Sequence, residues 1–394
     1  MKQALKKKDF TRNSVSSIKE KLNMTLNTAD DIIKSSAEKE TEFIPMPDAY
    51  VEATRLPGIP MGYLTLITGW SNTGKSTIKN CLIASCQRKG ILPIIFETEG
   101  NFDWKYAMDC GVKAEPIYGD VEVVDVDEET GEVSSHTEKQ IINYDGDFIF
   151  YDSKILAYNY GDNDYASGKK VSKKRKVAVI EDIAACINQI LDMQDNDEIQ
   201  QPVAFIWDSI GSIGSYKSYT SQTGNNMFDA GAIAQAFNYI INNRIPSSRK
   251  ISEPYTNSFI CVNKIWNDSM NSMGGVPSIE LKGGKTMMYG ARLVIHLGGI
   301  GKASTKKLEA TAKGQKYQYG ITTKIRVTKN QLPTPFNITY EGELSCVHNG
   351  LLSPDRLDEY KKEHMKDILK KLESLGAENV NEKDVNFKED ETNE

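Results

Sequence analysis

Short apolar runs separated by longer amphipathic stretches dominate the pattern of hydrophobic and polar positions in this chain. Residues 63–68, 92–97, 203–208, 259–263 and 291–297 are rich in β-branched and aromatic residues, which predicts buried strands. Residues 76–89, between the first two runs, have the pattern of a helix. Strands that alternate with helices are typical of an α/β fold with a doubly wound, mostly parallel sheet, in which ligands bind at the carboxyl ends of the strands.

The segments outside this pattern divide the chain into three parts. Residues 1–45 have helically spaced apolar positions, which predicts an N-terminal helical arm that either folds back on its own domain or packs on a neighbouring subunit in an oligomer. Residues 46–350 are expected to form the core, with an inserted α/β or β segment at about 113–180. Residues 351–394 comprise a helix and a tail; residues 378–394 hold seven acidic and two basic residues and are expected to be disordered.

A glycine-rich segment between the first strand and the helix carries the most specific signal for chemistry. It fits the phosphate-loop pattern at every fixed position, with the strand before it and the helix after it that the pattern requires. Backbone N–H groups and the helix N-terminus would point at phosphate oxygens, with Lys75 on the β and γ phosphates and Ser76 on Mg²⁺. The sequence therefore predicts ATP and Mg²⁺ as ligands of Gly69, Trp70, Ser71, Asn72, Thr73, Gly74, Lys75 and Ser76.

Composition and charge narrow the class of protein. The 394-residue chain is 39% hydrophobic and 26% charged, and it has no run of about 18 apolar residues that could span a bilayer. Its lysine-bearing start lacks the apolar stretch of a secretory signal, so we expect an intracellular protein with no membrane partner. The net charge of −6 argues against an overall basic nucleic-acid binder but allows a local basic groove. Six cysteines without a CxxC pair are expected to be buried free thiols.

Acidic residues follow two of the predicted strands. Asp208 ends one of them and is placed to hold Mg²⁺, with a helix-capping role as the alternative. Glu97 and Glu99 close another strand, where a carboxylate can polarise the water that attacks a γ-phosphate. Spacing alone does not choose between the two glutamates.

These motifs resemble those of RecA-family recombinases, and more closely those of the shorter, divergent recombinases of tailed phages, the UvsX type. The resemblance extends over roughly residues 45–350 and includes the segments 56–62 and 97–112. Matched residue by residue, it implies that Glu99 is the catalytic glutamate and that Asp103 and Tyr106 contact adenine, where an aromatic ring can stack on the base. Thr77 and Asn263, the latter at the end of a strand that senses the γ-phosphate, complete the implied nucleotide site.

The resemblance also implies two DNA-binding loops, at residues 212–226 and 266–285. The first is rich in Gly, Ser, Thr and Asn, which suits a mobile loop that contacts phosphates, although a plain surface loop has the same composition. In the second, lysine and tryptophan side chains could supply charge and base stacking. The residues implied to bind DNA are Ser212, Ser215, Lys217, Asn225, Asn226, Trp266, Gly274, Gly275, Lys282, Gly283, Gly284 and Lys285.

Several lysines bear on how hydrolysis would be coupled to assembly. Lys329 matches the first of two lysines that the family extends across a subunit interface toward the neighbour's ATP, with an ordinary strand lysine as the alternative. Two positions depart from the family: Lys264 replaces a glutamine that couples ATP to the second DNA loop, and Gln331 replaces the second bridging lysine. A cationic patch in the insertion either grips a DNA backbone or is simply solvated; it consists of Lys169, Lys170, Lys173, Lys174, Arg175 and Lys176.

The resemblance implies a DNA-dependent ATPase that forms a homo-oligomeric helical filament on single-stranded DNA. Such a protein promotes homologous pairing and strand exchange with double-stranded DNA in recombination and repair. Phage mediator and single-strand-binding proteins are implied partners, and the cytoplasm of a bacterial host is the implied location. A ring-forming RecA-fold motor of the replicative helicase type and a structural or regulatory ATP-binding protein that exchanges no strands are the alternatives.

Overall fold

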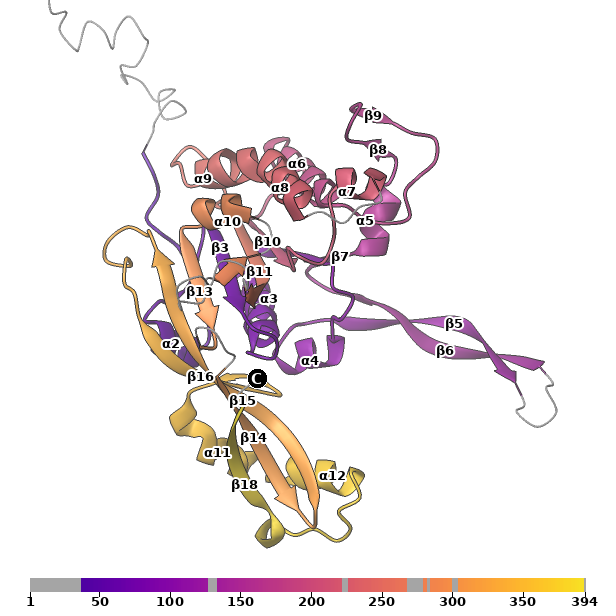
Figure 1. The fold of residues 1–394 in the computed structure, drawn as a ribbon, viewed down its shortest axis with the longest axis vertical. Coiled ribbons are helices and arrows are strands. Elements are labelled where there is room, and N and C mark those ends of the chain that lie inside the picture. Colours follow the sequence, from indigo (N-terminus) through magenta and orange to yellow (C-terminus); the bar gives the residue numbers. More distant parts are fainter. Residues whose placement is uncertain are drawn as a thin grey trace, which may run out of the picture.

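A large mixed sheet with helices on both faces forms the centre of the molecule (Figure 1). The computed structural model describes residues 37–126, 133–221, 226–267, 279–281, 284–299 and 304–392. The expected N-terminal arm lies outside these ranges over residues 1–36, whereas β1 (Phe43–Pro45) pairs with β2 (Gly58–Pro60) at the edge of the core. Among the described residues, no helix has both the length and the apolar character needed to cross a membrane.

The sheet confirms the expected α/β class, since its central strands are parallel. Its main path runs in the order β17-β16-β15-β13-β3-β11-β10-β4-β7, and the strands from β13 to β7 are parallel to one another. All five predicted strands are present, and β11 continues four residues beyond its expected end. The strands are β3 (Leu64–Gly69), β4 (Leu92–Glu97), β7 (Ile149–Asp152), β10 (Val203–Asp208), β11 (Ser258–Asn267), β13 (Leu293–Leu297), β15 (Gln315–Asn330), β16 (Glu341–Val347) and β17 (Gly350–Leu352).

Two apolar cores lie on opposite faces of this sheet. Side chains alternate between faces along a strand, so Phe205 and Trp207 of β10 enter one core and Ile206 enters the other. The first face is covered by α2 (Asp48–Thr54), α3 (Lys75–Lys89) and α4 (Trp104–Asp109). The second is covered by α5 (Ser153–Tyr160), α6 (Ile180–Asp195), α8 (Asn226–Tyr239), a π-helical turn (Ile240–Arg244), α9 (Ile245–Ser247) and α10 (Gly284–Gly290). All six cysteines are buried and free, as expected.

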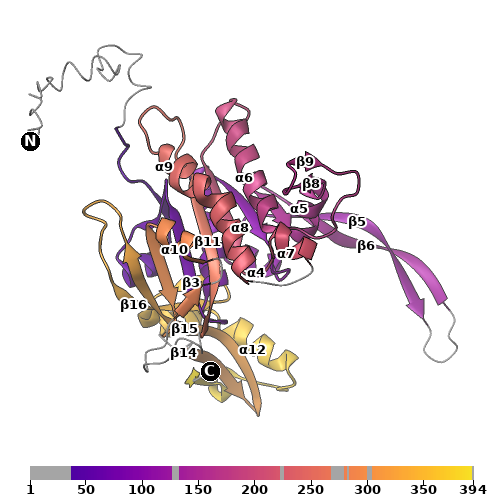
Figure 2. The same ribbon diagram turned by 45° about the horizontal axis from the view of Figure 1, so that its top comes forward.

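The segment predicted as an insertion contains a projecting arm and also a strand of the core. Strands β5 (Glu115–Val126) and β6 (Val133–Asp145) pair only with each other among the described residues and extend away from the body (Figures 1 and 2). A small hairpin follows, formed by β8 (Asn163–Asp164) and β9 (Lys169–Lys170). The boundary at 113–180 is wrong for β7, because Ile149 to Asp152 pair in parallel with β4 and complete the main sheet.

One member of the expected cationic patch belongs to the interior. The guanidinium of Arg175 donates to both carboxylate oxygens of Asp182 in α6, at 2.7 and 3.0 Å, and both side chains are almost fully buried. Arg175 therefore ties the insertion to the core and is not part of a solvent-facing surface. The lysines on either side of it are exposed.

The C-terminal part forms a unit with its own apolar cluster, built from β14 (Thr305–Ala312), the first half of β15, α11 (Leu357–Glu363) and α12 (Met365–Ser374). Short 3₁₀ turns lie at Pro354–Arg356 and Glu382–Asp384. The expectation of a disordered tail is wrong for residues 386–392, which form β18 (Asn386–Thr392) against β14. Opposite charges face each other across this pair, because Lys307 lies opposite Asp390 and Glu309 opposite Lys388.

Candidate nucleotide-binding site

The glycine-rich loop lies between β3 and α3, at the carboxyl edge of the sheet. β3 ends at Gly69 and α3 begins at Lys75, so residues 70–74 make the connection. Gly74 has a φ of 91°, and a Cβ atom there would lie 2.4 Å from the Sγ atom of Cys346. Only glycine fits such a position. Because the first N–H groups of a helix have no partner within it and carry partial positive charge, this turn is suited to bind an anion.

A cavity of about 720 Å³ opens beside the loop. This volume falls within the range of small-molecule sites. One wall is the loop and the first turn of α3, and the opposite wall is formed by β15 and by the end of β16. Between these walls lie Glu99, Tyr106, Asp208 and Lys264. The cavity therefore unites residues that are far apart in the sequence and that the phosphate-loop prediction requires together.

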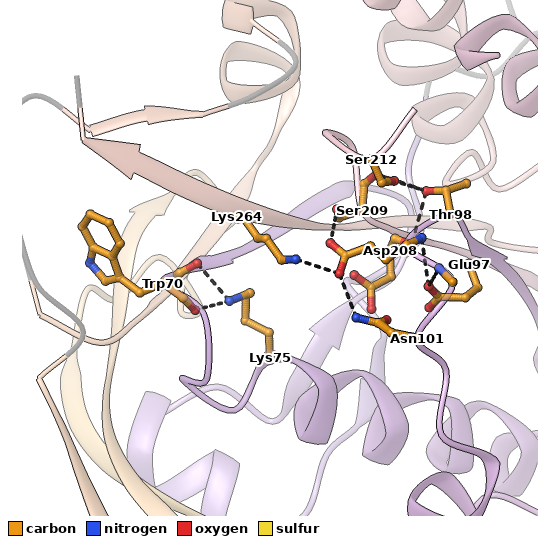
Figure 3. A network of polar contacts seen from close by, with 12 residues as sticks. Trp70, Lys75, Glu97, Thr98, Asn101, Asp208, Ser209, Ser212 and Lys264 are labelled. Atoms are coloured by element: carbon orange, nitrogen blue, oxygen red, sulfur yellow. Dashed lines mark hydrogen bonds and ion pairs between the residues drawn. The ribbon is translucent and has the colours of Figure 1, made fainter. Parts of the chain in front are cut away.

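Lys75 is turned toward the carbonyl oxygens of its own loop (Figure 3). Its Nζ atom donates to the carbonyl oxygen of Gly69 at 2.9 Å and also to that of Trp70. Burial, opposed by the negative charge of Asp208, lowers the pKa of Lys75 to about 8. A phosphate in the cavity would give the ammonium a charged acceptor in place of two neutral carbonyls, which adds the attraction between opposite charges to the hydrogen bond.

Asp208, at the end of β10, is held by a buried lysine that the sequence analysis did not single out. The Nζ atom of Lys79 lies 2.6 Å from Oδ2 of Asp208 and 3.3 Å from Oε2 of Glu97. Burial alone would lower the pKa of Lys79, but the charges of Asp208 and Glu97 outweigh burial and raise it. Lys79 follows Lys75 by four residues, so it lies on the same face of α3 one turn further along.

The two glutamates that spacing left unresolved have different surroundings. Glu97 is buried, and its Oε1 atom accepts hydrogen bonds from the backbone N–H groups of Glu99 and Gly100 at 3.0 and 3.1 Å. Burial raises the pKa of Glu97, although Lys79 opposes the shift. Glu99 lines the cavity and Glu97 does not. The structure thus assigns Glu97 to holding the strand end and leaves Glu99 facing the cavity.

Glu99 accepts hydrogen bonds from three side chains, those of Ser209, Asn101 and Lys264, which are labelled in Figure 3. Its Oε2 atom lies 2.8 Å from Nζ of Lys264 and 3.1 Å from Nδ2 of Asn101, and its Oε1 atom lies 2.5 Å from Oγ of Ser209. Burial would raise the pKa of Glu99, but the hydrogen bonds from Lys264 and Ser209 lower it overall. Three of the roughly four lone-pair sites of this carboxylate therefore accept a hydrogen bond in this structure.

Only some of the residues predicted to contact adenine and the γ-phosphate line this cavity. Tyr106 lines it, and its hydroxyl lies 2.6 Å from Oγ1 of Thr77. Asp103 is not part of the wall; its Oδ1 atom caps α4 by accepting the N–H of Tyr106 at 2.9 Å. Asn263, which is buried, lines a second cavity of about 290 Å³ on the other side of Glu99. Lys264 and Glu99 line both cavities.

Comparison with curated proteins gives partial matches to RecA. No protein-family model matches the chain. Protein RecA of Aquifex aeolicus is 34% identical over 87 residues, which are 22% of this chain and 25% of that protein. Protein RecA of Campylobacter lari is 38% identical over 66 residues, 17% and 19% of the two chains. Protein RecA of Oleidesulfovibrio alaskensis is 30% identical over 117 residues, 26% and 33% of the two chains.

The chain is similar to RecA proteins. The matches span at most a third of the length of these relatives. They support a RecA-like core, in agreement with the mixed α/β sheet, and leave the activity of the whole protein to be proposed.

The described part of the first segment predicted to bind DNA contains a short helix. Residues 216–221 form α7 (Tyr216–Ser221), and Ser215 is buried because its Oγ atom accepts the N–H of Ser218 at 3.1 Å. The Ser215 side chain is thus engaged within the protein in this structure, and its contact with DNA stays a prediction. Ser212 lies near the site, where its hydroxyl contacts that of Thr98, and Lys217 is exposed on α7. Asn225 and the side chain of Asn226, the first residue of α8, lie outside the described residues.

The second segment begins and ends in regular structure. Trp266 belongs to β11, which pairs with the short strand β12 (Ile279–Leu281), and Gly284 and Lys285 start α10. Gly274, Gly275, Lys282 and Gly283 lie outside the described residues.

Lys329 on β15 is directed at the end of helix α10. Its Nζ atom donates to the carbonyl oxygens of Met288 and Tyr289 at 2.8 and 3.0 Å. A cation at the carbonyl end of a helix is favourable. Lys329 is not part of the wall of the chain's own cavity.

Proposed function

We propose that this protein is an ATP-dependent recombinase of the RecA type. The observation that carries the proposal is the shared cavity, which brings together the phosphate loop, the strand-end Asp208 and the cavity-facing Glu99. The partial similarity to RecA proteins supports the same assignment. The chain would bind ATP there, hydrolyse it in the presence of single-stranded DNA, and assemble as a filament that pairs homologous strands.

The residues present suit a nucleotide with Mg²⁺. The glycine turn leaves room for a phosphate against the backbone, and Lys75 supplies the cation. The hydroxyl of Ser76 and the carboxylate of Asp208 are oxygen donors, which Mg²⁺ prefers. Mg²⁺ bound there would offset charge on the β and γ phosphates. Tyr106, which lines the cavity, would contact the base, and Asn263 lines the adjoining cavity.

In this proposal Glu99 orients and deprotonates the attacking water, and Lys329 acts in trans on the nucleotide of a neighbouring subunit. Lys329 does not line its own subunit's cavity, which is what a role across an interface requires. DNA would lie along segments 212–226 and 266–285. The tailed-phage character, the mediator and single-strand-binding partners and the bacterial cytoplasm belong to the same proposal and rest on the motif resemblance.

The test is the rate of ATP hydrolysis with and without single-stranded DNA for wild type, Lys75→Ala and Lys329→Ala. We expect DNA to stimulate the wild type, and both variants to lose roughly 100-fold, the usual effect of removing one group that stabilises transition-state charge. Lys154→Ala is the matched control, since Lys154 is exposed on α5 away from the cavity.

Electron microscopy of the wild type on DNA separates the alternatives. Continuous helical filaments agree with a recombinase, and strand-exchange assays then test the reaction itself. Closed rings would favour a ring motor. Hydrolysis that ignores DNA, together with no DNA-bound assembly, would overturn the proposal in favour of a structural or regulatory ATP-binding protein.

A further inference from the structure

We propose that Lys264 is a latch that holds Glu99 inactive and that DNA releases it. This inference rests on the proposed function and adds a regulatory step at the same site. Lys264 lies just before the second candidate DNA segment, next to the β11–β12 pairing. Its side chain contacts the carboxylate of Glu99, which faces the cavity.

Both oxygens of the Glu99 carboxylate are occupied in this structure. Ser209 donates to Oε1 and Lys264 and Asn101 donate to Oε2. A general base needs a free lone pair directed at the proton it takes, and its strength falls as its pKa falls. In this arrangement Lys264 and Asn101 occupy both lone pairs of Oε2, Ser209 occupies one lone pair of Oε1, and the ammonium of Lys264 weakens the carboxylate as a base. Release of Lys264 would free an Oε2 lone pair for the water proton and restore the strength of the base.

The stems of both candidate DNA segments contribute to this restraint. Lys264 directly precedes the first rung of the β11–β12 pairing, Ile265 opposite Leu281, and that hairpin flanks residues 268–278. Ser209 directly follows β10 and leads into the segment that begins at Ser212. A displacement of either segment would therefore shift a side chain that donates a hydrogen bond to Glu99. The donor next to the second segment, Lys264, is the charged one.

The Lys264 pair can open at little cost, in contrast to the Lys79 pair. The side chain of Lys264 is 42% exposed, so its ammonium can return to water or move to a phosphate when it leaves Glu99. The side chain of Lys79 is only 4% exposed and would leave two buried carboxylates unpaired. Lys264 also lines both cavities, so a phosphate bound in either cavity would lie close to the Lys264 side chain. The site thus combines a permanent lysine clamp with a releasable one.

The experiment compares wild type with Lys264→Met, which keeps the side chain length without the charge, and Lys264→Arg, which keeps the charge. We expect Lys264→Met to raise the DNA-free ATPase rate about five-fold, the low end of usual couplings between sites because the pair is partly exposed, and to reduce stimulation by DNA. Lys264→Arg should retain the wild-type stimulation. Lys139→Met, on the exposed strand β6, is the control for a lost surface charge.

A pH profile provides a readout that a structural role of Lys264 would not move. Loss of Lys264 removes a partner that lowers the pKa of Glu99, so the acidic limb of the rate profile should shift to higher pH in Lys264→Met. The other titratable groups of the site remain in both proteins, so the difference isolates the pair; they are Lys75, Lys79, Glu97, Asp208, Lys307 and His348.

The two proposals fail in different ways. A wild type that hydrolyses ATP equally with and without DNA would overturn the recombinase proposal and the latch together. A DNA-stimulated wild type whose Lys264→Met variant keeps the same DNA-free rate and the same acidic limb would overturn the latch alone. A raised DNA-free rate in Lys264→Met, with normal behaviour in Lys264→Arg, supports it.

Discussion

Replacing Lys79 by methionine removes the cation between two buried carboxylates while it nearly preserves the volume of the side chain. The side chains of Lys79, Glu97 and Asp208 are 4%, 2% and 8% exposed, and the ammonium lies 3.3 and 2.6 Å from the two carboxylates. Removal of one partner from a buried ion pair costs about 3–5 kcal/mol, because the remaining charge is desolvated and unpaired. Two charges remain here, so we expect the free energy of unfolding to fall by at least about 3 kcal/mol.

This loss should depend on pH in a defined direction. Burial and the nearby charge of Asp208 already raise the pKa of Glu97, and loss of Lys79 removes the partner that opposes this shift, so the folded-state pKa of Glu97 lies further above its unfolded value in the variant. The folded state of the variant then binds more protons than the unfolded state, so its stability falls as pH rises through those pKa values. The deficit relative to wild type should therefore be largest near about pH 7 and smaller near about pH 5, where Glu97 begins to protonate.

Urea unfolding followed by tryptophan fluorescence at the two pH values measures the deficit, and buried Trp207 of β10 reports from the same strand as Asp208. Lys105→Met is the control, because Lys105 is 81% exposed and its pair with Asp109 is worth at most about 0.5 kcal/mol. A deficit below about 1 kcal/mol for Lys79→Met, or one that does not change with pH, would refute the reasoning that these charges are desolvated.

Two further predictions concern the insertion and the tail. Arg175→Met should lower the free energy of unfolding by about 3 kcal/mol by leaving Asp182 buried without its partner, whereas Lys173→Met, at an exposed neighbour, should leave thermal unfolding unchanged. Phe387→Ala should cost about 1–2 kcal/mol, since its half-buried ring packs edge-on against Tyr319 at 5.8 Å, and hydrogen exchange should then accelerate in β14 and β18 but not in β10. Unchanged exchange in β14 would contradict the pairing of the tail.

The central strands could be predicted because each contains enough apolar residues to indicate that it is buried. β7 could not, since it has four half-buried residues in a segment of short alternating pieces, and only its parallel pairing with β4 makes it part of the core. β18 was not predicted because its acidic residues are typical of a disordered tail. Its pairing depends on lysines of β14 about 80 residues earlier in the chain, and such a distant complementarity is not visible in local composition.

The site residues that belong to a sequence motif could be predicted. Roles that depend on which atoms contact one another in the folded chain could not. The loop, Asp208 and Glu99 meet at one cavity, as their positions after parallel strands suggest. The choice between Glu97 and Glu99 depended on which carboxylate turns back to the backbone, and spacing does not determine that. Lys79 left one usable signal, a lysine on the buried face of α3 one turn after Lys75. The bond from the Ser218 N–H to Ser215 was not predicted, because a serine that caps a helix and a serine in a loop look alike in composition.

The β5–β6 arm sets a steric requirement on any array of this protein. Twelve and thirteen residues of extended chain make a rod about 40 Å long, comparable with the diameter of a small domain. Neighbouring subunits must leave space for this two-stranded ribbon, or the ribbon must lie on the outside of the array. The spacing and handedness with which subunits can follow one another are therefore restricted by a ribbon whose described residues are outside the buried clusters of the core.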